Sequence, residues 1–181
     1  MKKITLSVAL VFMISALFAQ KRTTTSAIIN FDATTSKDGL PKAENVASIA
    51  VIDPKKGTVA FETIIKNFSF TNPKIQEHFN GTNWMDSEKF PIAKFKGNIT
   101  NLADINFNKN GTYNINVEGE LTIHGIAQPL KVPAIIVING KAMQASTSFT
   151  IKLDDYNITG PAIGTGKVSK EPKITVIADF K

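Results

Sequence analysis

The chain has 181 residues, 21 Lys and Arg against 15 Asp and Glu, a formal net charge of +6, and no cysteine. This length fits one domain, and 43% hydrophobic residues with 20% charged residues is a composition that folds rather than stays disordered. The absence of cysteine excludes disulfides, thiolate metal sites, iron–sulfur clusters and a cysteine nucleophile. Two histidines are too few for an imidazole-rich metal site. The composition favours a binding protein over an enzyme.

Residues 1–19 have the layout of a secretory signal peptide. Lys2 and Lys3 form a basic start, residues 4–18 carry no charge, and Ala19 offers a small residue for cleavage. The apolar stretch is too short to span a membrane as a helix, although a retained N-terminal anchor is the alternative. We therefore expect a mature single domain over 20–181, without a membrane span, in the periplasm or outside the cell.

The positive charge of the mature chain is small and scattered. Lys21-Arg22 and Lys55-Lys56 are its longest basic runs, and elsewhere basic and acidic residues are interspersed. Such a mixed surface is typical of a solvated domain, so no nucleic-acid partner is expected.

Hydrophobic alternation with a period of two dominates the mature chain. Between Tyr113 and Ile123 the odd positions are mainly apolar and the even positions polar, which predicts a long strand with one buried face. Asp53 to Gly57, Asn110-Gly111 and Asn139-Gly140 are turn signals between such runs. The pattern predicts eight strands, over 25–32, 46–53, 58–66, 92–100, 111–123, 128–138, 142–153 and 172–181.

Eight mostly antiparallel strands predict an all-β fold, an eight-stranded antiparallel lipocalin-like barrel whose lumen holds one small ligand. A two-sheet sandwich is the first alternative, because periodicity alone does not separate the two architectures. An outer-membrane barrel, with its apolar residues facing lipid, is the second.

The loop over 67–91 is far more apolar than an ordinary connection. Asn72 followed by Pro73 predicts the start of a short helix, and Gly81 its end. The loop carries six large apolar residues, Phe68, Phe70, Phe79, Trp84, Met85 and Phe90. Such a loop must pack onto something, either as a lid that contacts a ligand or as a plug that closes the core.

Three ordered segments carry a resemblance to a known family. The first includes Phe68-x-Phe70, residues 76–80 and residues 85–97, the second is Gly119 to Gly125 with Pro129, and the third is Phe149 to Ile158. Together they resemble the YceI-like family of lipid-binding proteins over nearly all of 25–181. The resemblance implies a lipocalin-like barrel with its apolar face inside, usually exported, that encloses a long isoprenoid chain and has no catalytic activity.

The resemblance and the strand pattern together indicate an exported carrier or store for an isoprenoid lipid, a quinone or another long-chain amphiphile. No cofactor, metal or catalytic residue is expected, and the sequence leaves a homodimer open. The candidate ligand-binding residues are Phe61, Phe68, Phe70, Ile75, Phe79, Trp84, Met85, Phe95, Tyr113 and Phe149. A stress or interaction protein with a filled core is the alternative, and a hydrolase or isomerase acting in the lumen is a third reading.

One departure from the family bears on the headgroup of the ligand. Many members have an Arg-Asp pair just before the helix histidine, where this chain has Ile75 and Gln76. Arginine binds phosphate through two parallel hydrogen bonds, so its absence favours a neutral headgroup over a pyrophosphate. Lys74 or Lys94 would substitute only as point charges.

Two apparent motifs carry no chemistry. The run Gly160 to Lys167 has the wrong spacing for a phosphate-binding loop, because position 161 is Pro and position 168 is Val. His78 and His124 lie far apart in the sequence without a carboxylate pattern near them, which disfavours a metal site or a catalytic triad.

The first testable prediction concerns export. Because residues 2–19 have the charge and hydropathy layout of a cleaved leader, N-terminal sequencing of the exported protein should start at or within a few residues of Gln20. A membrane-bound protein that retains Met1 would contradict this expectation.

Overall fold

The structure is a computed structural model that describes residues 21–181, so the predicted signal peptide lies outside the described residues. The strands are β1 (Arg22–Asp32), β2 (Lys42–Asp53), β3 (Thr58–Ile64), β4 (Ser69–Phe70), β5 (Ile92–Ile99), β6 (Gly111–Ile123), β7 (Ile126–Asn139), β8 (Ala142–Thr150) and β9 (Lys173–Phe180). The helices are α1 (Pro73–Asn80), α2 (Pro161–Gly164) and three 3₁₀ turns, η1 (Ile65–Asn67), η2 (Leu102–Asp104) and η3 (Leu153–Tyr156). Over residues 21–181, no helix has the length and hydrophobicity needed to cross a membrane.

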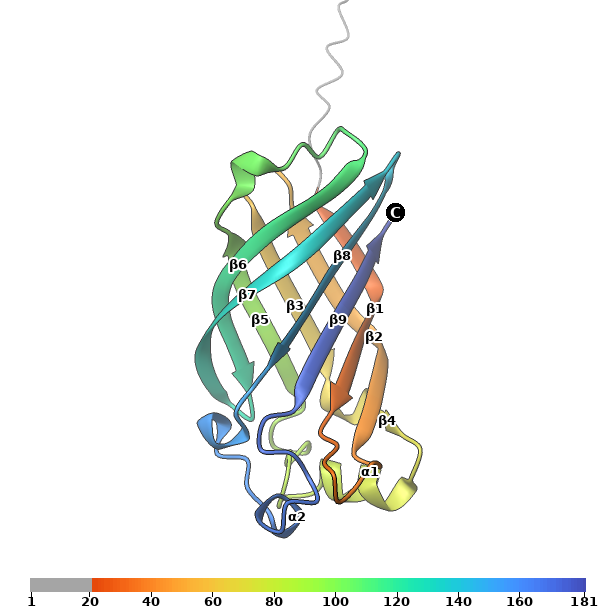
Figure 1. Ribbon diagram of the computed structural model, residues 1–181, viewed down its shortest axis with the longest axis vertical. Helices are drawn as coiled ribbons and strands as arrows, with labels where there is room; N and C mark the ends of the chain where they lie inside the picture. Colours follow the sequence, from red (N-terminus) through yellow and green to blue (C-terminus); the bar gives the residue numbers. More distant parts are fainter. Residues whose placement is uncertain (1–20) are drawn as a thin grey trace, which may run out of the picture.

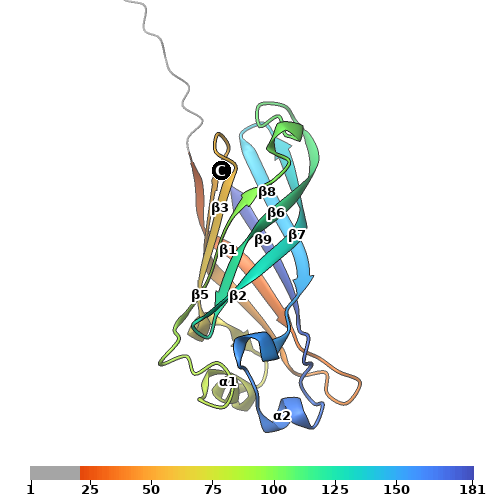
Figure 2. The ribbon, with the colours of Figure 1, turned by 90° about the vertical axis from the view of Figure 1, so that its left-hand side faces the viewer.

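The eight long strands close into an antiparallel barrel (Figure 1). Each strand pairs with its neighbour along the chain, and pairing of β9 with β1 closes the circle. The two-residue β4 is an extra strand at the edge of β2. The predicted fold class is therefore confirmed, and the sandwich alternative is wrong. Helices α1 and α2 lie at one end of the barrel, called here the helical end, and the 100–110 loop covers the opposite end (Figure 2).

Alternation along the strands places the apolar side chains inside. On β6, Ile115 and Val117 are buried while their neighbours Asn114 and Asn116 are exposed. The same parity on the other strands gives one continuous core rather than two separate layers. The barrel interior is therefore built from the face that the sequence pattern singled out as apolar.

Two turns differ from the sequence-based expectation. Asn110-Gly111 is not a hairpin turn, because Gly111 already begins β6 and the Asn110 side chain accepts a hydrogen bond from the Gly140 amide at 2.8 Å. The second turn joins β6 to β7 at His124 and Gly125, with φ of 52° and 75°. Two successive positive φ values match the twist of the strands. Histidine is uncommon at such a position, so His124-Gly125 does not stand out in the sequence as a hairpin turn.

A buried polar cluster supports β2 where its pairing with β1 shifts register. The Asn45 amide donates to Thr63 Oγ1 at 2.8 Å and to the Ile64 carbonyl at 3.0 Å, and the Ser48 hydroxyl donates to the same threonine oxygen at 2.8 Å. Asn45 and Ser48 are fully buried. Because these groups bond one another, their burial leaves the interior free of unpaired polar atoms at this point.

A pair of glycines allows the backbones of β5 and β6 to approach each other closely on the inner face. Gly97 and Gly119 face each other in the ladder, and both lie on the inner face. A methyl group on Gly97 would come within 2.5 Å of the Glu118 carbonyl and 2.6 Å of the Phe95 ring. The Phe95 ring thus occupies the inner space that two side chains would otherwise fill.

Substitution of Gly119 tests this packing. A methyl group there would overlap the Lys96 carbonyl and the Gly97 Cα, so Gly119→Ala should lower the free energy of unfolding by about 1–3 kcal/mol in urea denaturation. Gly164→Ala is the matched control, because a methyl group at Gly164 meets no atom within 4 Å. Equal stability of the two variants would show that the wall relaxes around position 119.

Candidate functional site

The barrel encloses a cavity of about 170 Å³. Inward side chains from all eight long strands line it, and residues of the 67–91 loop close it at the helical end. The lining is dominated by the branched aliphatic and aromatic residues Ile29, Phe31, Ile52, Val59, Phe61, Phe95, Ile115, Val117, Leu121, Ile136, Phe149, Val176 and Phe180. A site of this kind recognises hydrocarbon rather than charge, because it excludes water and offers carbon surface almost everywhere.

The structure brings six of the ten candidate residues to this cavity, namely Phe61, Phe68, Phe79, Met85, Phe95 and Phe149. Phe70 and Trp84 are buried just outside it, in contact with rings that line it. Ile75 packs against the core from α1. Tyr113 lies towards the opposite end, where its hydroxyl donates to the Lys109 carbonyl at 3.0 Å. Inward parity alone therefore does not bring a residue to the cavity, because the ends of the barrel are filled by loops.

Five aromatic residues form a plug between the cavity and the helical end. We use the name aromatic plug for Phe31, Phe68, Phe70, Phe79 and Trp84. Phe79 lies at its centre, with ring centroids 5.6 Å from Phe31, 5.7 Å from Phe68, 4.9 Å from Phe70 and 5.4 Å from Trp84. The tilted and edge-on arrangements are those that aromatic quadrupoles prefer.

Helix α1 holds Phe79 in the aromatic plug. The helix starts as predicted, since the Asn72 side chain accepts from the Lys74 amide at 3.0 Å and Pro73 occupies the first position. It ends at Gly81, although the φ of Gly81 is −72° rather than left-handed. The Gln76 side chain accepts from the Phe70 amide at 3.3 Å, which ties the helix to β4.

Two buried polar atoms in or beside the aromatic plug lack a hydrogen-bond partner. Within residues 21–181, the buried side-chain atoms without a hydrogen-bond partner are Trp84 Nε1 and Asn80 Oδ1. A buried donor or acceptor left unpaired costs about 1–3 kcal/mol, so packing of the rings outweighs this loss. Phe90, the sixth large residue of the loop, lies elsewhere and covers the β6–β7 turn, with its ring 4.3 Å from that of His124.

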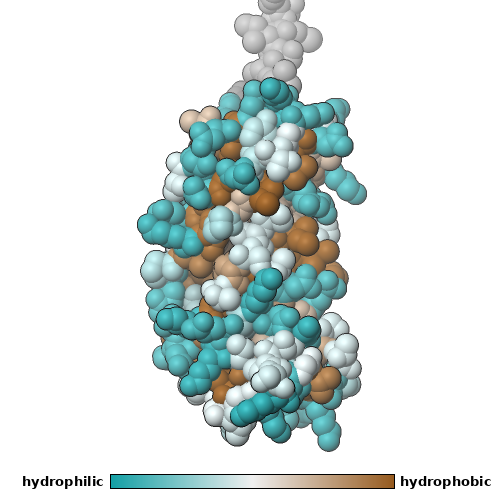
Figure 3. Space-filling model, viewed as in Figure 1, coloured by the Kyte–Doolittle hydropathy of each residue, from teal (hydrophilic) through white to brown (hydrophobic). Residues whose placement is uncertain are grey.

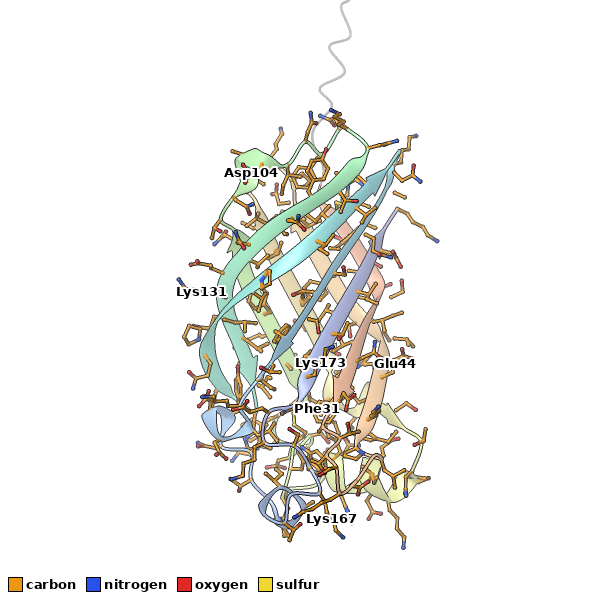
Figure 4. The ribbon with its side chains drawn as sticks, viewed as in Figure 1. Phe31, Glu44, Asp104, Lys131, Lys167 and Lys173 are labelled. Carbon is orange, nitrogen blue, oxygen red and sulfur yellow. The ribbon has the colours of Figure 1, made fainter. Side chains whose placement is uncertain are left out.

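Phe31 is the main site residue that sequence reasoning missed. Phe31 is the second-last residue of β1 and lies beside the helical end (Figure 4). It lines the cavity and contacts Phe70, Phe79 and Trp84. The sequence does indicate that Phe31 points inward, because Ala27, Ile29 and Phe31 alternate along one strand and are all buried. The 67–91 loop carries the other four residues of the aromatic plug, so composition alone points to the loop and not to β1.

The opposite end of the barrel is also covered. Leu102, Ile105 and Phe107 of the 100–110 loop pack against the core there. Leu102 lies against the β2–β3 turn, where a methyl group on Gly57 would approach its Cδ2 to 3.0 Å.

Two charged residues, Glu62 and Lys94, belong to the cavity lining, and both are exposed. Burial, and secondarily the Asp155 charge, raises the pKa of Tyr156 to about 12, so this phenol stays neutral. His124 Nδ1 lies 3.1 Å from the Tyr156 carbonyl, and His78 is exposed on α1. Residues 21–181 contain no group of three or more His, Asp or Glu side chains that could hold a metal ion.

An eight-stranded antiparallel barrel around an apolar cavity has the architecture of lipocalin-like proteins. A model of the YceI-like domain matches residues 12–180, so the chain belongs to the YceI-like family and the resemblance seen in the sequence is confirmed. This is a family of binding proteins. A search of curated proteins gave no match.

Solved structures share the fold at low sequence identity. A polyisoprenoid binding domain from Saccharophagus degradans, implicated in plant cell wall breakdown, has a TM-score of 0.74 and 10% identity, covering 89% of this chain and 97% of that one. Burkholderia cenocepacia BcnA has a TM-score of 0.67 and 22% identity, covering 84% and 96%. A Campylobacter jejuni YceI protein has a TM-score of 0.53 and 17% identity, covering 100% and 99%.

Truncation of Phe79 tests the aromatic plug. This side chain is 2% exposed and touches four other rings, so Phe79→Ala should cost about 3–5 kcal/mol of unfolding free energy. Phe107→Ala, on the partly buried 100–110 loop, should cost less in the same thermal denaturation series. A Phe79 variant as stable as the Phe107 variant would show that the plug contributes little to the fold.

Proposed function

We propose that the protein is an exported carrier or store that encloses the chain of an isoprenoid lipid, a quinone or a similar long amphiphile. The observation that carries this proposal is the cavity, which is enclosed by eight strands and lined by aliphatic and aromatic side chains. A flexible hydrocarbon is insoluble, so it must be kept from water along its length while it is moved or stored. Burial of apolar surface contributes about 25 cal/mol per Å², from which the cost of ordering the chain is subtracted.

Two further observations support a lipid ligand. The first is family membership, and the second is the shared fold with a polyisoprenoid binding domain from Saccharophagus degradans. The predicted leader over 1–19 supports a periplasmic or secreted location for such a carrier. The ten candidate residues stay our prediction for ligand contact, with Phe61, Phe95 and Phe149 as the strand residues that line the cavity.

The headgroup of the proposed ligand is neutral. The positions at which many family members carry Arg and Asp hold Ile75, which packs on the core, and Gln76, which bonds the Phe70 amide. The single arginine, Arg22, lies at the opposite end of the barrel and donates to the Lys141 carbonyl at 2.7 Å. Without a guanidinium near the helical end, a phosphate there would lack its usual bidentate partner.

One observation favours the alternative, a secreted stress or interaction protein with a filled core. The cavity volume of about 170 Å³ is below the roughly 300–1,000 Å³ that is usual for ligand pockets. A ligand longer than this volume requires the aromatic plug or the cavity walls to move apart. Solvent extraction of protein purified from its native host, followed by mass spectrometry, distinguishes the two functions. A stoichiometric co-purified lipid supports the carrier, and its absence supports the filled core.

Cavity filling tests the site itself. Ala145 lines the cavity, so Ala145→Phe should abolish saturable binding of a long isoprenoid quinone by the delipidated protein. Trp84 is the single tryptophan and contacts Phe31 and Phe79, which line the cavity, so its fluorescence reports occupancy. Ala142→Phe on the same strand is exposed and should bind like the wild type. Equal binding by both variants would place the ligand outside the cavity.

A further inference from the structure

The barrel wall is not hydrogen-bonded along its whole length. The β7–β8 ladder pairs Ala134–Asn139 with Ala142–Thr147 and stops there. Towards the helical end, residues Ile126 to Pro133 of β7 pair only with β6. The last three residues of β8 pair only with β9. The two strands diverge from their shared turn on the face seen in Figure 1. We call this unpaired stretch, residues 128–133 of β7 against 148–152, the seam.

The sequence of β7 explains why the ladder ends. In an antiparallel pair the N–H and C=O of one residue point to the same neighbour. The Pro133 carbonyl accepts from Thr147 Oγ1 at 2.7 Å, so this edge of residue 133 faces β8. The backbone groups of residues 131 and 129 point to the same side, because backbone directions repeat every second residue along a strand. Two of these three residues are proline, which has no N–H to donate to the next strand.

The seam borders the cavity directly. Leu130 and Val132 on one side, and Phe149 and Ile151 on the other, all line the cavity. Leu130 and Phe149 are only half-buried although both belong to the inner face. On the outside, Figure 3 shows apolar surface between polar side chains on this face of the molecule. The helical end of the seam is bounded by η3, where the Gln128 side chain donates to the Asp155 carbonyl at 2.8 Å.

The two ends of the barrel are closed by packed side chains. The aromatic plug fills the helical end, and the 100–110 loop covers the opposite end. A continuous ladder joins each of the pairs β3–β5 and β5–β6 beside the cavity. The β7–β8 ladder does not extend into the seam, so the seam can open without breaking ladder hydrogen bonds. Opening the aromatic plug would instead separate five packed rings.

We propose that the seam is the entrance through which the ligand chain passes sideways into the barrel, leaving its headgroup at the rim. This rests on the proposed lipid-binding function and adds the position of the entrance to it. The rim is polar, with exposed Lys131 (Figure 4) on one side and exposed Lys152 on the other. Lys131 forms an ion pair with Glu118 at 3.0 Å. The cavity behind the rim takes hydrocarbon, so a polar headgroup is best solvated where the wall opens.

The same edge disfavours a protein strand as the occupant of the seam. A peptide that adds to a sheet needs a row of backbone donors and acceptors on the exposed edge. Pro129 and Pro133 remove two donors from that row, and Lys131 lies between them, which is how natural sheets protect an edge. The edge is thus open to a chain that needs no hydrogen bonds.

Clamping the seam tests the proposal, and the cysteine-free chain makes the chemistry specific. Lys131→Cys with Thr150→Cys places exposed thiols on the two sides of the seam, to be joined by a bis-maleimide with a reducible centre. Lys66→Cys with Glu88→Cys replaces an exposed ion pair and clamps the 67–91 loop instead. Val137→Cys with Gln144→Cys joins an exposed pair already in register in the β7–β8 ladder, away from the cavity lining, and is the control for modification itself. Uptake of two probes is followed, a fluorescent C18 polyene fatty acid and a long isoprenoid quinone.

The seam-clamped protein should lose uptake on the timescale over which the unclamped protein saturates, and reduction of the linker should restore it. The loop clamp and the ladder control should take up the probes normally. In addition, Pro133→Val restores a donor on the β8 side and should slow uptake without abolishing binding, whereas Pro54→Ala, in the β2–β3 turn, should not. If the loop clamp blocks uptake and the seam clamp does not, the seam is not the entrance, and the entrance lies at the aromatic plug. Failure of the unclamped protein to bind either probe would instead overturn the proposed function.

Discussion

Pairing of β9 with β1 closes the sheet and gives the molecule an interior. Five residues of β1 pair with β9, and this short ladder turns an open antiparallel sheet into a barrel with a separate inside. Once the circle is closed, the two-residue period of every strand assigns each side chain to the interior or to water. The interior then consists almost wholly of carbon, apart from the Asn45–Ser48–Thr63 cluster, whose members bond one another. The cavity follows from the circumference of eight strands rather than from any single residue.

The strands were predictable because their period is strong and their neighbours are near in sequence. Seven of the eight barrel ladders join strands that are consecutive among the eight, so turn chemistry and alternation together define the order. The turn at His124-Gly125 was not predictable in the same way, because the close contact of Phe90 with both residues stabilises it from outside the hairpin. The aromatic plug was half predictable. Its loop residues were evident from composition, but Phe31 joins them only through the fold.

The candidate site shows where strand parity ceases to be informative. Phe61 and Phe95 lie midway along their strands, Phe149 lies near the end of β8, and all three face the cavity, as their parity indicates. Tyr113 has the same parity near the end of β6, but there the 100–110 loop fills the barrel and takes its hydroxyl as a donor. Phe70 and Trp84 belong to a loop, where no period exists, and their rings pack behind Phe31 and Phe79. Parity predicts the direction of a side chain, whereas distance from the barrel ends decides what it meets.

The prolines of β7 show how one sequence feature has two consequences at different levels of structure. At the level of the strand, Pro129 and Pro133 were a mild irregularity in a good alternating pattern, because their partners in β6 still pair with them. At the level of the sheet they fall on the edge that faces β8, and the ladder on that side ends at Ala134. A residue without an N–H therefore leaves one neighbour in place and releases the other, depending only on which edge it occupies. A barrel that must stay closed to water and yet admit an insoluble chain needs such a local loss of pairing, since a fully bonded wall opens only by breaking its hydrogen bonds.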